Sequence, residues 1–244
     1  MRKFFKAKVY MLLLATLLGF VACDQEEDLD VNMPLYGHWT REIEGDEPYT
    51  ARLVINENQS LLWVVPQVEG HQSSGAYFEL SGDELSFTSD SECGDKKGVY
   101  HFEITGDELV LTKMEDESEA RASSFEGKWK WIDYNKVQLS QIEMMVNYPW
   151  AVEKSIIDGQ EYSVDETILK WIDVKPDFSC KTNMGDVVKM STIGEDEFLL
   201  DFQNELIYDY TMKILSIDTD HIKAKFSIEN VQMNMIIEFK SLKD

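Results

Sequence analysis

The sequence predicts an all-β protein that consists of two small antiparallel meander β-barrels in tandem. Three observations lead to this prediction. A hairpin sequence occurs twice, apolar side chains near the C-terminus alternate with a period of two, and a second, longer repeat divides the chain. An export signal and an acidic tether are expected to precede the barrels.

The first 22 residues have the composition of an export signal. Four basic residues lie within 2–8, and an almost unbroken apolar run covers 9–22. This run is too short for a membrane-spanning helix, which needs about 20 residues. A basic head, a short apolar stretch and a small residue before the cut are together typical of a signal peptide. We therefore predict that 1–22 is removed from the mature protein.

The sequence GFVAC at the end of this signal resembles a bacterial lipobox, which is cut before a cysteine that carries lipid. Phe20 stands where such boxes usually have leucine. The resemblance implies that Cys23 is the lipid attachment site and that a lipid anchor joins the protein to a membrane. Ordinary secretion with a free Cys23 thiol is the alternative.

An acidic tether is predicted at 23–34. Residues 24–30 read DQEEDLD and contain five acids, so this stretch carries too little apolar surface to fold. Acidic residues directly after a lipidated cysteine also resemble the surface-export signals of some Gram-negative lipoproteins. The sequence thus predicts an outer-membrane lipoprotein exposed at the cell surface, with the periplasmic face as the alternative.

The charge of the mature chain excludes one class of partner. Cleavage would remove four of the 23 basic residues and none of the 46 acidic ones, which leaves a formal net charge of −27. Such a field repels phosphate backbones, and counterion release needs clustered cations. We therefore expect no nucleic-acid partner. The acids are spread along the chain, as in a solubilising surface.

The repeated hairpin is the first element of the predicted fold. Residues 81–88 read SGDELSFT and residues 105–112 read TGDELVLT, and alternating apolar runs flank both Gly-Asp pairs. Glycine accepts the positive φ that a tight two-residue turn requires. We therefore predict two successive hairpins of a meander, with turns at Gly82 and Gly106.

The last three strands are predicted from alternation alone. Residues 208–214, 222–228 and 233–239 each place apolar side chains at every second position. A period of two over strands of this length indicates an antiparallel sheet with one buried face. Long strands of this kind must pair their edges, and closing into an up-and-down barrel achieves this.

A second repeat suggests a division into two domains. Residues 35–39 read LYGHW and 125–129 read FEGKW, so each places an apolar residue, a glycine and a tryptophan in the same order. We expect Gly37 with Trp39, and Gly127 with Trp129, to open one barrel each. The predicted domains are 35–124 and 125–244. One continuous larger barrel or sandwich is the alternative.

The Gly-x-Trp openings resemble those of the lipocalin-like, or calycin, group, in which the tryptophan closes one end of a meander barrel. The stretch 89–129 is similar to small lipocalin-like domains of bacterial lipoproteins. The residues that carry this similarity are Asp90, Cys93, Gly98, Tyr100, Gly106, Asp107, Asp116, Ser118 and Arg121. Ser118 replaces the second cysteine of the pattern, so the local disulfide that the family implies is absent. The resemblance implies two lipocalin-like β-domains.

The second domain is expected to contain an insertion near 137–165, where the meander pattern lapses. Apolar residues at helical spacing in this stretch end at Pro149, which predicts a helix or a long loop across the mouth of the second barrel. Packing against the barrel and a mobile lid are the two interpretations.

No catalytic motif stands out. The sequence contains no nucleophile elbow, zinc-protease helix, phosphate loop or Cys-x-x-Cys pair, so we expect no enzyme activity, no metal and no cofactor. A hydrolase with carboxylate chemistry remains a distant alternative. Cys93 and Cys180 form a possible disulfide, and two reduced thiols are the other interpretation.

The aromatic residues are the remaining candidates for a binding site. Trp63 and Trp150 are the best of these, because both neighbour prolines or loops at expected barrel ends, although packing in the core explains most aromatics. The resulting hypothesis is a non-catalytic, lipid-anchored binding protein for a small apolar ligand or a glycan. The alternative is a structural accessory of an outer-membrane protein complex, with solid barrel cores.

Overall fold

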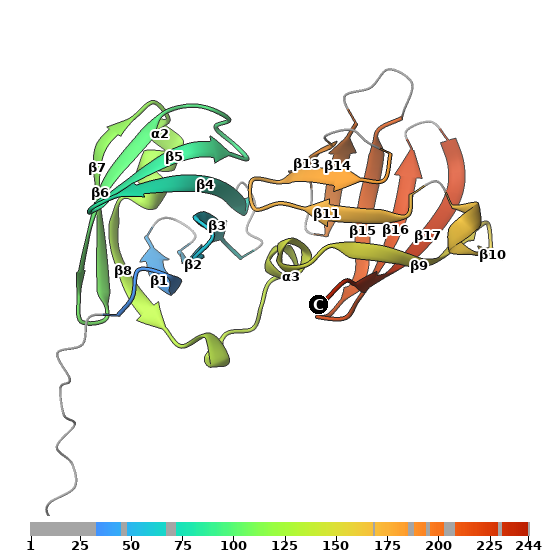
Figure 1. Cartoon of the computed structure of the whole chain (residues 1–244), viewed down its shortest axis with the longest axis horizontal. Helices are drawn as coiled ribbons and strands as arrows, with labels where there is room; N and C mark the ends of the chain where they lie inside the picture. Colours follow the sequence, from blue (N-terminus) through green and yellow to red (C-terminus); the bar gives the residue numbers. More distant parts are fainter. Residues whose placement is uncertain are drawn as a thin grey trace, which may run out of the picture. The chain divides into compact units, whose positions relative to one another are not determined.

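The computed structural model describes residues 33–44, 48–66, 72–167, 169–184, 188–193, 196–202, 208–228 and 231–243. These residues form two closed antiparallel β-barrels, which confirms the predicted all-β class and the two meander barrels (Figure 1). The predicted signal peptide, Cys23 and all of the tether except its last two residues lie outside the described residues. Within the described part, no helix has the length and apolar character needed to cross a membrane.

The first barrel has up-and-down topology and closes by pairing its first strand with its last. Trp39 of β1 lies opposite Trp131 of β8 at this closure. Its eight strands are β1 (Gly37–Ile43), β2 (Tyr49–Ile55), β3 (Ser60–Val64), β4 (Ser74–Ser81), β5 (Glu84–Asp90), β6 (Gly98–Thr105), β7 (Glu108–Asp116) and β8 (Gly127–Ile132).

The two hairpin repeats form the turns that the sequence predicts. Gly82 connects β4 to β5 with φ +66°, and Gly106 connects β6 to β7 with φ +58°. Positive φ is the conformation that glycine adopts without steric cost. The alternation after each turn places Leu85 and Leu109 inside the barrel, where both are fully buried.

The structure corrects the predicted domain boundary at residue 125. The second Gly-x-Trp sequence does not open the second barrel, because Gly127 starts β8, which pairs with β7 and β1 of the first barrel. The residues before this predicted boundary form the end of β7 and the short helix α2 (Glu119–Phe125). The sequence repeat therefore marks two neighbouring strands of one barrel.

The second barrel is closed by pairing of β9 with β17. The short strand β10 (Gln160–Tyr162) extends β9 outside this ring. The strands of the ring are β9 (Trp150–Ile157), β11 (Trp171–Val174), β12 (Ser179–Thr182), β13 (Val188–Thr192), β14 (Glu197–Asp201), β15 (Tyr210–Ile217), β16 (His221–Ile228) and β17 (Val231–Ser241).

The predicted insertion at 137–165 is a helix followed by a barrel strand. Residues up to Pro149 contain the 3₁₀ helix η1 (Tyr134–Lys136) and the helix α3 (Gln141–Asn147), whose Ile142 and Met145 are buried. After the proline, however, β9 belongs to the barrel wall, and 3₁₀ helix η2 (Val164–Glu166) follows β10. The helix that the spacing predicts therefore covers α3 only, because the alternation of a strand resumes at Trp150 and Val152.

The two barrels have separate cores that meet at strand β3. All five residues of β3 are buried, because Leu61 and Trp63 belong to the first core while Leu62 and Val64 pack in the cluster of the second barrel. A strand that is buried on both faces reads as a continuous apolar run, as this one does in SLLWV. This arrangement fixes Trp63 on the inner face of the first barrel.

Candidate functional site

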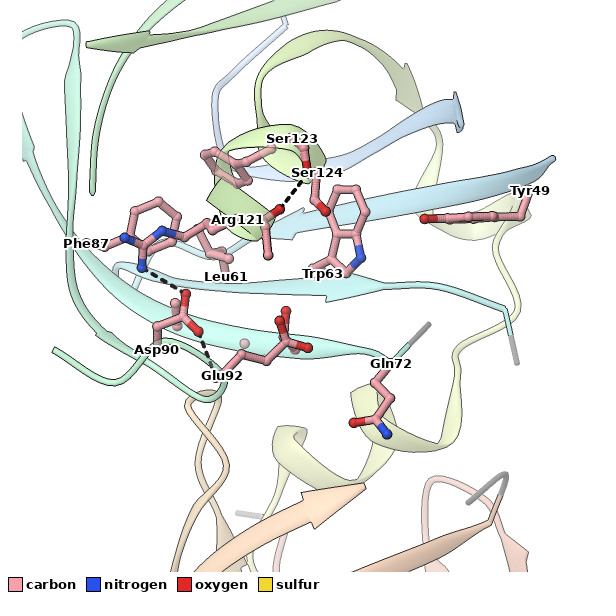
Figure 2. A pocket seen from close by; sticks show the side chains of 15 residues that line it. Tyr49, Leu61, Trp63, Gln72, Phe87, Asp90, Glu92, Arg121, Ser123 and Ser124 are labelled. Carbon is pink, nitrogen blue, oxygen red and sulfur yellow. Dashed lines mark hydrogen bonds and ion pairs between the residues drawn. The ribbon is translucent and has the colours of Figure 1, made fainter. Parts of the chain in front are cut away.

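A cavity of about 230 Å³ lies at one end of the first barrel, between α2 and the strands β2 to β5 (Figure 2). Apolar side chains form its inner part, and polar side chains from the β5–β6 loop and α2 form its rim. The described lining residues are Tyr49, Leu61, Trp63, Gln72, Ser74, Gly75, Ala76, Phe87, Asp90, Glu92, Ala120, Arg121, Ser123, Ser124 and Phe125.

The apolar wall is made by aromatic rings that hold each other in place. Trp63 meets Trp129 edge to face, with ring centroids 5.3 Å apart, and Phe87 meets Phe125 in the same way at 5.2 Å. Edge-to-face pairs at these separations are favourable beyond the apolar area that they bury. The wall is therefore rigid, and Trp63 and Phe87 present preformed surfaces to the cavity.

The indole N–H of Trp63 differs from those of the other deeply buried tryptophans. Among the hydrogen bonds of the described residues, none involves this N–H, although the side chain is only 8% exposed and lines the cavity. Three other indole groups donate to main-chain carbonyls: Trp39 to Leu35 (2.9 Å), Trp129 to Phe125 (3.1 Å) and Trp150 to Met145 (3.0 Å). The N–H of Trp63 is thus available to a molecule in the cavity.

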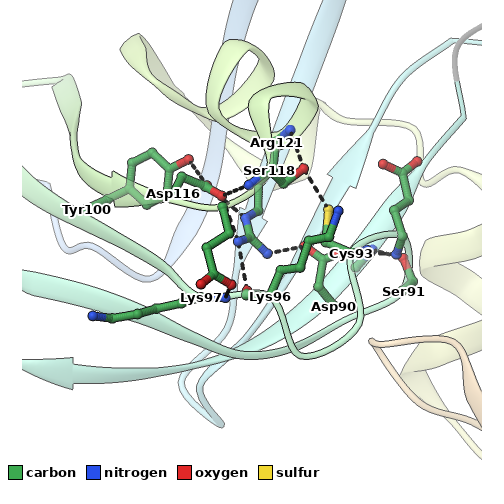
Figure 3. A network of polar contacts seen from close by, with 12 residues as sticks. Asp90, Ser91, Cys93, Lys96, Lys97, Tyr100, Asp116, Ser118 and Arg121 are labelled. Carbon is green, nitrogen blue, oxygen red and sulfur yellow. Dashed lines mark hydrogen bonds and ion pairs between the residues drawn. The ribbon is translucent and has the colours of Figure 1, made fainter.

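Arg121 organises a buried polar network at the rim (Figure 3). Its guanidinium donates to both oxygens of Asp116, at 2.9 and 2.8 Å, to Asp90 at 3.1 Å and to the carbonyl of Lys96 at 2.9 Å. The same group lies 4.5 Å from the ring centroid of Phe87. Because its positive charge is shared by two carboxylates, Arg121 is a structural cation and has little attraction left for an anion.

The electrostatics of the network favour ionised Asp116. Burial opposes ionisation of this carboxyl group, but hydrogen bonds from Arg121, from the Tyr100 hydroxyl and from the Ser118 amide hold its pKa below the ordinary value. Burial and the hydrogen bond to Asp116 raise the pKa of Tyr100. Tyr100 therefore stays protonated and acts as a donor.

Both described cysteines are free thiols, so the structure does not contain the possible disulfide between Cys93 and Cys180. The Cys93 thiol donates to the Ser118 hydroxyl at 3.1 Å, and burial raises its pKa. Cys180 is fully buried in the second barrel, where burial likewise raises its pKa. Cys93 and Cys180 belong to different barrels, and each packs against its own neighbours.

Glu92 is the rim carboxylate without a cation. Its amide donates to Asp90 at 2.8 Å, which anchors the β5–β6 loop, but no ion pair or hydrogen bond of its carboxylate is found among the described residues. Reduced solvation at the rim raises the pKa of Glu92, and the nearby charge of Asp90 raises it further. In Figure 2, Glu92 lies beside Asp90, on the loop side of the cavity.

The two tryptophans that the sequence suggests as ligand contacts lie in different surroundings. Trp63 lines the cavity, whereas Trp150 is fully buried and donates to the Met145 carbonyl at the end of α3. The proline beside Trp150 marks the start of a strand and not an open barrel end. Gly37, Trp39, Gly127 and Trp129 all lie in the first barrel.

Sequence reasoning missed Glu92 and the position of Arg121 over the cavity. Arg121 was identified only as part of the resemblance pattern, and Glu92 lies in a loop of ordinary acidic composition. No local signal distinguishes Glu92 from the other acids. The described residues contain no group of three or more His, Cys, Asp or Glu side chains that could hold a metal ion.

The fold and the cavity define the class of this protein. It is an all-β protein with two closed antiparallel barrels, and an open cavity with aromatic side chains in its wall lies in the first of them. No protein-family model matches the chain, and no curated protein matches it either.

Proposed function

We propose that this protein is a non-catalytic, lipid-anchored binding protein of the cell surface, and that a small ligand occupies the cavity of the first barrel. The observation that carries this proposal is the preformed cavity beside Trp63, whose indole N–H makes no hydrogen bond with the described residues. A ligand oxygen in the cavity would accept a hydrogen bond from this N–H.

The size of the cavity limits the ligand. A cavity of about 150 Å³ in another protein holds benzene, so a space of about 230 Å³ is suited to a single ring with a short side chain. The aromatic wall favours an apolar ring or the apolar face of a sugar. The polar rim would orient the remaining part of the molecule.

The proposal includes membership of the lipocalin-like group, and the network in Figure 3 supports it. Residues from the resemblance pattern that are separated in sequence come together there: Asp90, Cys93, Gly98, Tyr100, Asp116, Ser118 and Arg121. Their arrangement around one guanidinium supports the proposed membership.

Ligand occupancy is tested by native mass spectrometry on the chain that starts at Asp24. We expect gently purified protein to carry a small molecule that is lost on denaturation. Ser74 lies directly opposite Trp63 on the inner face, so Ser74→Phe fills the cavity and should abolish this mass. Ser216→Phe, at an exposed position of β15, is the matched control.

A ligand-free spectrum, followed by no binding of 2-phenylethanol to the same protein in isothermal titration, would overturn the proposed binding function. If Ser74→Phe and Ser216→Phe retain the ligand equally, the ligand does not bind in this cavity.

The lipid anchor is tested by fractionation of cells that express the full chain. We expect the unaltered protein in the outer-membrane fraction and accessible to added protease on intact cells. Cys23→Ser should release it from the membrane fraction, because the acyl chains supply the binding energy. Membrane association that survives Cys23→Ser would contradict the anchor.

A further inference from the structure

The charges around the cavity do not cancel. Arg121 is the cation among the described lining residues, and its guanidinium is shared by Asp116 and Asp90. Two carboxylates, Asp90 and Glu92, and one guanidinium line the cavity, so the formal charge of its described lining is negative.

The position of Glu92 suggests a role in binding. Glu92 is an exposed loop residue that lines the cavity, and its carboxylate has no partner among the described residues. Partial desolvation and the neighbouring Asp90 raise its pKa. A carboxylate at the mouth of a cavity is accessible to the cationic part of a bound molecule. The structure thus tolerates a charge that it does not itself neutralise.

We propose that the cavity of the first barrel binds a small organic cation, a primary amine on an apolar or aromatic body, with Glu92 as the counter-ion of the ammonium group. This inference rests on the proposed binding function and specifies the charge class of the ligand. The ring would lie against Trp63 and Phe87, and the ammonium group would lie at the rim.

The chemistry of the rim agrees with this ligand. An ammonium group offers three donors, and the rim offers the Glu92 carboxylate together with the side chains of Ser74 and Ser124, for which no hydrogen bond to another described side chain is found. A carboxylate or phosphate ligand would instead meet Glu92 and Asp90 without a free cation. The net charge of the whole chain, −23, also attracts a cation.

The test compares three probes of one shape and different charge: 2-phenylethylamine, 2-phenylethanol and phenylacetate. Each is titrated by isothermal calorimetry into the chain that starts at Asp24 and into its Glu92→Gln and Glu84→Gln variants. Glu84 is the first residue of β5, the strand that precedes the loop with Glu92, and it does not line the cavity. Glu84→Gln is therefore the matched control.

We expect the amine to bind about tenfold more tightly than the alcohol, and phenylacetate to bind more weakly than either. Glu92→Gln should bring the amine to within about twofold of the alcohol and leave the alcohol unchanged. The thermal midpoint of ligand-free Glu92→Gln should be equal to or above that of the unaltered protein, which separates lost binding from lost folding.

Equal affinity for amine and alcohol would overturn the inferred charge class while the binding function stands. The same holds if Glu92→Gln leaves the preference for the amine intact. If none of the three probes binds, and Ser74→Phe and the unaltered protein behave alike, both this inference and the proposed function are wrong.

Discussion

Each of the two Gly-x-Trp sequences makes the same local structure. The tryptophan side chain turns back, and its indole N–H donates to the carbonyl of the apolar residue four positions earlier. The glycine between them takes a positive φ, +150° at Gly37 and +134° at Gly127, a region that other residues rarely adopt. The motif therefore fixes the start of a strand through this hydrogen bond and the glycine conformation, and we call this arrangement a clamp.

Gly37→Ala should weaken the first barrel. A Cβ at this position would lie 2.2 Å from the ring of Trp131 and would also force an unfavourable φ. We expect a loss of about 2 kcal/mol or more in the free energy of unfolding, measured by urea titration. Gly106→Ala has open space around its Cβ, so only the backbone cost of about 1 kcal/mol remains. Equal losses for both variants would contradict the clamp.

Arg121 holds the rim of the cavity together at the residue scale. Arg121→Met removes a buried cation and leaves Asp90 and Asp116 unpaired, which should cost about 3–5 kcal/mol in urea unfolding. Lys128→Met removes an exposed ion pair with Glu108 and should have little effect. A similar small change in both variants would show that the network does not contribute to stability.

The ionisation of Asp116 makes the free energy of unfolding depend on pH in the acidic range. Its pKa is lowered in the folded protein, so its contribution is complete above the ordinary carboxylate pKa of about 3.9 and is lost as the pH falls through the lower folded value. The difference in unfolding free energy between the unaltered protein and Asp116→Asn should be constant between about pH 5 and 7 and should shrink below about pH 4. A difference that grows on acidification would contradict this sign.

At the scale of elements, α2 connects the network to the barrel. Ser118 caps the helix by accepting from the amide of Arg121, and it also accepts from the Cys93 thiol of the β5–β6 loop. This contact lies at the position where the lipocalin-like pattern has a second cysteine. A hydrogen bond thus joins the loop and the helix here.

Ser118→Cys should create a disulfide with Cys93. The two side chains are already within 3.1 Å, and closing a loop of about 25 residues should add about 3 kcal/mol, against about 1 kcal/mol for the lost cap. The oxidised variant should therefore unfold at a higher temperature than the unaltered protein, and the reduced variant at a lower one. Ser118→Ala measures the lost cap alone. Free thiols that persist after oxidation would contradict the expected geometry.

At the scale of the whole molecule, the acidic surface opposes folding through self-repulsion. The full chain carries a formal charge of −23, and mobile ions screen such repulsion over about 10 Å at 0.1 M salt. The thermal midpoint should rise between about 0.01 M and 0.3 M sodium chloride. Choline chloride at equal ionic strength should act alike if screening is the cause. A midpoint that falls with salt would show that ion pairs outweigh the repulsion.

Much of the fold could be predicted because its signals are local. The hairpin turns at Gly82 and Gly106 and the alternation in β15 to β17 depend on neighbours a few residues away, and the structure confirms them. The boundary between the barrels could not be predicted in this way. Whether Gly127 begins a new barrel or completes the first depends on its pairing with β1, far away in sequence.

The candidate site was predictable only in part for the same reason. Trp63 stood out by its place beside a proline, but Trp150 had the same signal and lies in a solid core. The two tryptophans differ in the hydrogen bond of the indole N–H. That of Trp150 donates to the Met145 carbonyl, whereas that of Trp63 has no acceptor among the described residues. The sequence around each tryptophan does not predict whether a carbonyl lies within hydrogen-bond distance of its N–H.

The sequence by itself determined the all-β class, the meander and its tight turns, because strand period and glycine turns are properties of short segments. Only the tertiary structure decided which strands close each barrel, that α2 and Arg121 lie over a cavity, and that Glu92 has no cationic partner among the described residues. These depend on contacts between segments that the chain brings together when the barrel closes. The energy of each such contact depends on two residues that are distant in sequence, so it cannot be predicted from one short segment.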